Sequence, residues 1–180
     1  MNNILNLFSS RYYIEIISST YALNFFIPNF ILISLSFSGD YELISEIAIV
    51  IGINIIFTQT FSSNARSLII SKKPKISLES FLIFRMFFSI LFVFLNIIIL
   101  NYFKFSNFNI LFLISILIIL QWLNELVITY FEINNNIKKI YLYFSLQLFF
   151  LINITVNIFF VESLEIVLLI FNILLLLFLL

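Results

Sequence analysis

The strongest constraint on this chain is a succession of six long apolar runs that are separated only by short polar segments. A helix of about 20 apolar residues crosses a bilayer core about 30 Å thick, because each residue rises about 1.5 Å. Lipid offers no hydrogen-bond partner for the amides of an open strand, so each run is expected to be helical. The predicted membrane spans are 13–37, 43–61, 81–103, 108–131, 141–160 and 164–180.

The chain has too few polar residues to form a water-facing surface. Hydrophobic residues make up 63% of the chain, charged residues make up 10%, and the mean hydropathy is +1.18. A soluble domain is about half apolar and about a quarter charged. We therefore predict an all-α fold, a polytopic transmembrane helix bundle that forms a single domain over 1–180.

The residue types also limit the chemistry. Cysteine and histidine are absent, which removes thiol nucleophiles, imidazole bases and the usual zinc ligands. We expect no metal, no cofactor and no enzymatic activity. The formal net charge is zero, so no nucleic-acid partner is expected.

The basic residues predict the orientation of the spans, because they concentrate in cytoplasmic loops. If the N-terminus is cytoplasmic and six spans alternate, only Lys104 falls in an outer loop. The basic residues on the cytoplasmic side are then Arg11, Arg66, Lys72, Lys73, Lys75, Lys138 and Lys139. This distribution predicts a cytoplasmic N-terminus.

The last predicted span stops at Leu180, inside the leucine-rich run 174–180, with no basic anchor or polar tail after it. A final membrane span usually finishes in interfacial residues. We therefore expect the chain to be truncated at its C-terminus, or to be one lobe of something larger.

Polar residues recur at helical spacing within the first four spans and less regularly in the fifth. Such residues are costly in lipid, so their spacing marks the face that avoids it. Together these stripes predict a hydrated cleft that opens toward the cytoplasm, although hydrogen bonding between helices is the alternative for each residue. The cavity-lining candidates are Glu15, Asn54, Thr58, Gln59, Asn96, Gln121, Asn124 and Glu125. The sixth span carries only Asn172 and is expected to be the most lipid-exposed helix.

Two charges lie inside the spans at similar depths. Arg85 follows the start of the third span by a few residues, and Glu125 precedes the end of the fourth by a few. An ion pair between adjacent helices is one interpretation, and snorkelling of Arg85 to the headgroups is a second. A direct role in binding a substrate or a coupling ion is a third.

The segment 39–42 (GDYE), followed by a helix that ends in 59–69 (QTFSSNARSLI), resembles a known pattern. It is similar to the N-terminal region of polysaccharide flippases of the multidrug/oligosaccharidyl-lipid/polysaccharide exporter superfamily. In these proteins a short outer loop leads into a long second helix, a basic loop, and a third helix with an early arginine, here Arg85. The resemblance covers residues 13–140 as a pattern.

The resemblance implies one lobe of a two-lobe exporter in the bacterial inner membrane. Such an exporter moves a polyprenyl-diphosphate-linked oligosaccharide to the outer leaflet by alternating access, for polysaccharides such as the O-antigen of lipopolysaccharide. It implies that Arg66 and Arg85 bind the diphosphate, since the arginine fork binds phosphate oxygens bidentately. Glu15 and Glu125 would be their counter-ions or sites for a coupling cation. The implied partners are membrane lipids, the lipid-linked glycan, and a missing C-terminal lobe or a second copy.

Three alternatives stay open. A small six-helix transporter subunit that docks on a separate energising module fits the length of 180 residues. A membrane enzyme of the same glycan pathway, such as a polymerase, is disfavoured by the short loops, which leave little room for acid/base groups. A structural subunit without transport would have no use for broad polar stripes.

Overall fold

The computed structural model describes residues 2–37, 39–62, 65–71, 78–157 and 161–179, with the backbone alone at 2–11, 157 and 161–163. All regular structure in these ranges is α-helical, which confirms the predicted fold class. The helices are α1 (Asn2–Ser36), α2 (Tyr41–Thr60), α3 (Ala65–Ile70), α4 (Leu78–Phe103), α5 (Phe108–Ile133), α6 (Ile137–Asn157) and α7 (Val161–Leu179).

Five stretches are long and apolar enough to cross a membrane, counted over the described residues. They are Tyr12–Ser36, Tyr41–Ile70, Leu78–Phe103, Phe108–Ile133 and Ile137–Val156. The sixth predicted span corresponds to α7, whose described apolar part, Leu164–Leu179, is shorter. The chain is therefore a multi-pass membrane protein with the helical bundle that its apolar runs predict.

Short polar turns join α1 to α2, α4 to α5 and α5 to α6 where the sequence predicts them, whereas residues 161–163, which separate the last two predicted spans, belong to α7. Gly39 adopts a φ of +79°, and the Asp40 carboxylate caps α2 by accepting the amide of Leu43 at 3.1 Å. Asn135 adopts a φ of +51° between α5 and α6, a left-handed conformation that asparagine tolerates better than most residues. The basic segment with Lys72, Lys73 and Lys75 lies outside the described residues.

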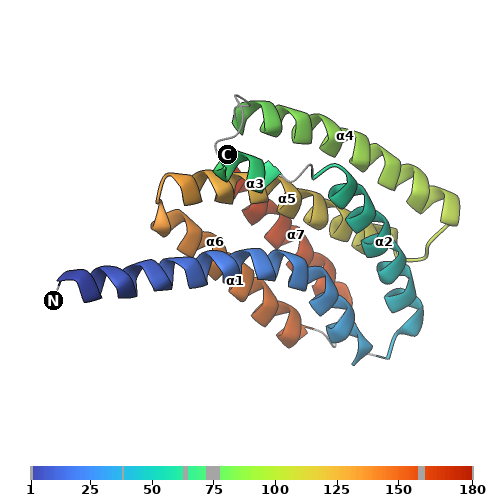
Figure 1. Ribbon diagram of the computed structural model, residues 1–180. Helices are drawn as coiled ribbons and strands as arrows, with labels where there is room; N and C mark the ends of the chain where they lie inside the picture. Colours follow the sequence, from blue (N-terminus) through green and yellow to red (C-terminus); the bar gives the residue numbers. More distant parts are fainter. Residues whose placement is uncertain (1, 38, 63–64, 72–77, 158–160, 180) are drawn as a thin grey trace.

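α5 is the central helix of the bundle, and it packs against α1, α2, α3, α4, α6 and α7 (Figure 1). In its most apolar 18-residue stretch, 72% of the residues are buried, compared with 22% for the corresponding stretch of α4. α5 also carries polar residues, among them Ser115, Gln121 and Asn124, and a helix with such residues avoids lipid by lying inside the bundle. Leu111, Ile114, Leu117 and Ile128 of α5 are completely buried.

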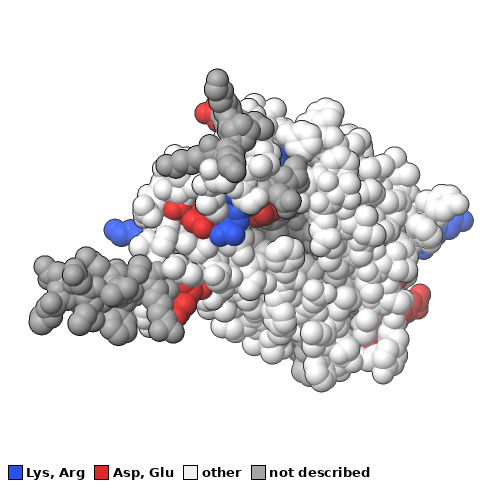
Figure 2. All heavy atoms as spheres, in the orientation of Figure 1, with Lys and Arg blue, Asp and Glu red and all other residues white. Residues whose placement is uncertain are grey.

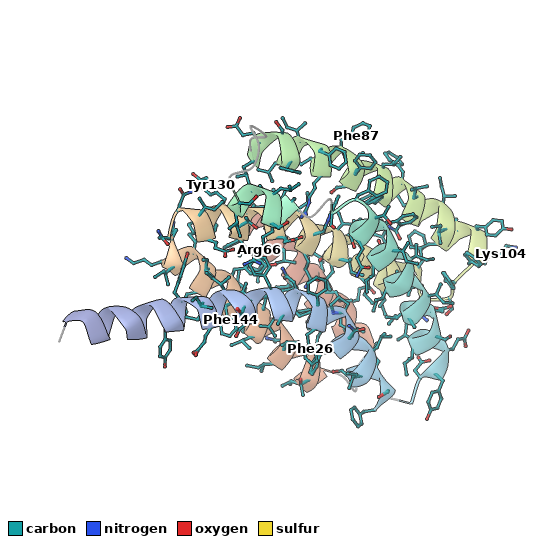
Figure 3. The ribbon with its side chains drawn as sticks, viewed as in Figure 1. Phe26, Arg66, Phe87, Lys104, Tyr130 and Phe144 are labelled. Atoms are coloured by element: carbon teal, nitrogen blue, oxygen red, sulfur yellow. The ribbon has the colours of Figure 1, made fainter. Side chains whose placement is uncertain are left out.

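The last span is not the most exposed helix, which corrects the prediction, although one apolar side of α7 is exposed. α7 packs along α5 and α6, and Asn172 is buried with its amide donating to the carbonyl of Leu113 at 2.9 Å. α4 lies instead at the edge of the bundle (Figure 1). One side of α4 is exposed, as Figure 3 shows for Phe87. One amide in the sixth span was enough to require a partner inside the bundle, and α5 provides it.

A buried polar cluster joins α2, α4 and α5. The amides of Asn54 and Asn96 bond each other reciprocally, at 3.0 Å and 2.9 Å. Ser115 of α5 accepts from Asn54 at 3.3 Å and donates to Asn96 at 3.2 Å. Asn54 and Asn96 are therefore interhelical contacts, which is the alternative that the sequence left open for them, and the cleft described below does not include them.

A second polar contact stabilises the turn between α4 and α5. Glu46 of α2 is buried, and its carboxylate accepts the backbone amide of Ser106 at 2.9 Å and its hydroxyl at 3.1 Å. The amide of Asn107 lies 3.4 Å from the same carboxylate. Because an anion near a helix N-terminus is favourable, Glu46 stabilises the start of α5 as well as the turn.

We expect Asn96→Leu to lower the free energy of unfolding by about 1 kcal/mol, because a hydrogen bond between membrane helices contributes on the order of 0.6–1.7 kcal/mol. The matched control is Asn101→Leu, since Asn101 is exposed and donates to Ile97 of its own helix at 2.8 Å. Unfolding in mixed micelles, followed by far-UV circular dichroism, measures both. Equal stabilities of the two variants would contradict the role of the cluster.

Candidate functional site

A cleft lies between α1, α2 and α5 and reaches the end of the bundle where α3 lies, here called the α3 end. Its walls are shared by Phe25 of α1, Thr58 and Gln59 of α2, and Trp122 and Glu125 of α5. The inner compartment has a volume of about 80 Å³ and the outer compartment about 310 Å³. The inner walls add Tyr21, Asn24, Pro28, Ile55, Ile118 and Gln121, and the outer walls add Ser62, Ala65, Arg66 and Ser67.

Charge gathers at the α3 end of this cleft. Figure 2 shows basic and acidic atoms beside each other there, while the middle of the visible face is nearly free of charge. In Figure 3 Arg66 lies between α3 and α1. The uncharged band matches a bilayer core, and the charged groups match an interface with water.

Arg66 lies at the mouth of the cleft and forms a bidentate ion pair with Glu132. Its Nε donates to Glu132 Oε2 at 3.2 Å and its Nη2 donates to Oε1 at 2.9 Å. The guanidinium also lies over the ring of Tyr21, 4.2 Å from its centroid. The two side chains are 40% and 18% exposed, so solvent and ligands can reach this pair.

α1 takes part in the same group through two tyrosines. The hydroxyl of Tyr21 lies 2.9 Å from the hydroxyl of Thr129 and donates to Glu132 Oε2 at 3.2 Å. The hydroxyl of Tyr13 donates to the backbone carbonyl of Glu132 at 2.7 Å. We call Tyr13, Tyr21, Arg66, Thr129 and Glu132 the mouth cluster; it ties α1 and α3 to the last turns of α5.

Arg85 forms a second ion pair in a different setting. It is 1% exposed, and its Nη1 donates to Glu125 Oε2 at 3.0 Å and to the backbone carbonyl of Trp122. Its Nη2 reaches the carbonyl of Ser62 at 3.3 Å. The guanidinium also lies over the indole of Trp122, 4.8 Å from the ring centroid. The predicted ion pair between adjacent helices is thus confirmed, and Arg85 itself is shielded behind Glu125 and Trp122.

The structure divides the remaining predicted cavity residues into two groups. Thr58, Gln59, Gln121 and Glu125 line the cleft. Asn124 does not: it is buried on another side of α5, where its amide donates to the carbonyl of Leu175 in α7 at 3.1 Å. Glu15 is exposed on α1, and the walls described above do not include it.

Tyr21 and Asn24 are cleft residues that sequence reasoning missed. Asn24 accepts from Tyr143 at 3.0 Å and from Gln147 at 2.6 Å, which fixes α1 against α6. The signal for Tyr21 was its position, since it lies well inside the first span while most other tyrosines flank the spans. Glu132 was also missed as a site residue, because it lies at the end of its span, where acids are common.

No protein family, no curated protein and no solved structure matches this chain. Among the residues that the structure describes, no group of three or more acidic side chains is placed to hold a metal ion. The site is therefore characterised by its own geometry: aromatic and amide walls with one paired arginine at the mouth and another behind the wall.

We expect Glu125→Gln to lower the free energy of unfolding by roughly 2–3 kcal/mol, because the charge of Arg85 is then left buried without its counter-ion. Arg85→Met combined with Glu125→Gln should cost less than the two single changes added together, by at least about 1 kcal/mol. Unfolding of the four proteins in mixed micelles gives this coupling energy. Strict additivity would show that the two charges do not stabilise each other.

Proposed function

We propose that this chain is one lobe of a transporter that moves a polyprenyl-diphosphate-linked oligosaccharide across the bacterial cytoplasmic membrane. The cleft between α1, α2 and α5 is its half of the pathway, and a second lobe or a second copy of the chain supplies the other half. The observation that carries this proposal is the contrast between two exposed faces of the bundle.

The exposed side chains of α4 and α7 suit lipid. Between residues 83 and 98 of α4 and between residues 166 and 177 of α7, every exposed residue is a large apolar one. Bulky apolar side chains without polar groups are what acyl chains accommodate at no cost. These two faces therefore need no further partner.

The exposed side chains of α1 and α2 are different. Over residues 18–33 and 45–60 most of them are small or polar. They are Ser18, Ser19, Ala22 and Asn29 of α1, and Ser45, Ala48, Gly52, Gln59 and Thr60 of α2. We call these residues the α1–α2 face. It is continuous with the cleft, because Gln59 belongs to both.

Small residues let another membrane helix approach closely, and polar ones face protein or water more readily than lipid. A second helix bundle against the α1–α2 face would enclose the cleft and shield these groups from acyl chains. Alternating access by rocking of two bundles around a central cavity is a common transporter design. This reasoning favours half of a transporter over a bundle that faces lipid on all sides.

The cleft has the chemistry that an amphiphilic anion needs. Arg66 at the mouth offers a planar fork for phosphate oxygens, and the amides of Asn24 and Gln59 offer partners for sugar hydroxyls. Phe25 adds an exposed aromatic surface for the lipid chain or a sugar ring. Arg85 is 1% exposed, so the proposal assigns the phosphate to Arg66 and leaves Arg85 a structural role.

The distribution of charge favours a cytoplasmic α3 end. Arg66, Lys138 and Lys139 lie at this end, with the basic segment 72–77 between α3 and α4 in the sequence. Lys104 lies at the opposite end, where Figure 3 labels it, together with the acidic Asp40 and Glu42. By the positive-inside rule the N-terminus is then cytoplasmic, and the mouth of the cleft opens toward the leaflet where the lipid-linked glycan is made.

We expect Gly52→Leu to reduce delivery of lipid-linked glycan to the outer leaflet at least about ten-fold, because it fills the surface that the second bundle must approach. A Cβ atom added at Gly52 meets nothing within 4 Å in this chain, so membrane insertion and helicity should be unchanged. Delivery is measured in cells that depend on the full-length protein for glycan export.

The matched control is Ile90→Phe, which adds bulk to the exposed face of α4 and should leave delivery unchanged. Normal delivery by Gly52→Leu would remove the α1–α2 face from the proposed pathway. Loss of delivery by Ile90→Phe would show that the contrast between the faces has no functional meaning.

A further inference from the structure

The Nε–Nη2 edge of Arg66 is already occupied by an anion, the carboxylate of Glu132. We propose that Glu132 is an internal competitor of the ligand: it holds Arg66 when the cleft is empty, and an incoming phosphate displaces it. The displacement also weakens the contact between α1 and α5 and so couples ligand binding to movement of α1. This inference rests on the proposed function and adds a residue and a regulatory step to it.

The competition follows from the geometry of the pair. The two carboxylate oxygens of Glu132 lie 3.2 Å and 2.9 Å from Nε and Nη2 of Arg66, the side-by-side arrangement in which an arginine also binds two phosphate oxygens. A phosphate therefore cannot use this edge until Glu132 leaves. The negative charge of Glu132 also opposes a second anion on the remaining edge.

The pair is accessible from the side on which a ligand would arrive. Arg66 lines the outer compartment of the cleft, and its side chain is 40% exposed. Arg85 and Glu125 provide the contrast, because Arg85 is 1% exposed and has two backbone carbonyls besides the carboxylate. A phosphate can therefore replace the carboxylate that binds Arg66, but it cannot reach Arg85.

The contacts of Glu132 link this exchange to α1. Its carboxylate accepts from Tyr21 at 3.2 Å, and the Tyr21 ring supports the guanidinium of Arg66 from 4.2 Å. When Glu132 moves away, Tyr21 keeps Thr129 as its hydrogen-bond partner and loses the charged one. The contact between α1 and the end of α5 is then weaker, which lowers the cost of moving α1 against the rest of the bundle.

The test uses the full chain in nanodiscs, with farnesyl diphosphate as the probe. Binding is followed by the fluorescence of Trp122, which is the only tryptophan and lines the cleft. Glu132→Gln keeps the size and hydrogen-bonding capacity of the side chain and removes its charge. We expect it to bind the probe at least about ten-fold more tightly than the unaltered chain.

Two further variants serve as a control and as a test of Arg66 itself. Glu79→Gln removes an exposed acidic charge at the start of α4 and should leave affinity within about two-fold, since the site does not involve it. Arg66→Gln should abolish probe binding in both the native and the Glu132→Gln background. Circular dichroism of each variant confirms that the helices are retained.

A second readout follows α1 directly. The chain has no cysteine, so spin labels can be attached at Ile14→Cys on α1 and Tyr130→Cys on α5, both exposed in the structure. Either adding the probe or introducing Glu132→Gln without it should lengthen or broaden the distance between the labels. An unchanged distance in both cases would overturn the coupling to α1.

The outcomes separate this inference from the proposed function. If Arg66→Gln abolishes binding but Glu132→Gln binds no more tightly than the unaltered chain, Glu132 is not a competitor and the proposed site stands. If the affinity of Arg66→Gln for the probe equals that of the unaltered chain and that of Glu132→Gln, Arg66 is not the phosphate site and both proposals fail.

Discussion

The structure depends on one constraint: inside a bilayer, each polar group of a helix needs a partner within the protein. α5 supplies these partners to its neighbours. Ser115 forms hydrogen bonds with the asparagines of α2 and α4, and Thr129 forms one with Tyr21. Glu125 pairs with Arg85, and Glu132 pairs with Arg66. These groups recur along a mostly apolar helix, so α5 both fills the core and sets where each neighbouring helix lies.

The two ion pairs have different roles: one stabilises the bundle, and the other is the proposed ligand site. The pair formed by Arg85 and Glu125 joins α4 to α5, with Glu125 in the wall of the cleft and Arg85 buried behind it. The pair formed by Arg66 and Glu132 lies at the mouth, reachable from the cleft and bonded to α1. An arginine that is paired but accessible can exchange its carboxylate for a phosphate, whereas a buried one is fixed by the cost of separating its charges.

Helical class, span positions and turns could be predicted from the sequence, because the length of an apolar run and the spacing of polar breaks are local properties. Which neighbour each polar face meets could not. Asn54 and Thr58 lie on the same face of α2, yet Asn54 bonds Asn96 and Thr58 lines the cleft. α4 and α7 were equally ambiguous, since both are apolar and only packing decides how much of each helix faces lipid.

The most direct test of α5 as the shielded axis is quenching of Trp122 by lipids with brominated acyl chains. Its side chain is buried in α5, so its fluorescence should be almost insensitive to these lipids. A tryptophan moved to exposed Phe94 of α4, in a Trp122→Phe background, should be quenched strongly. Equal quenching at the two positions would mean that acyl chains reach α5, and the proposed arrangement of the bundle would be wrong.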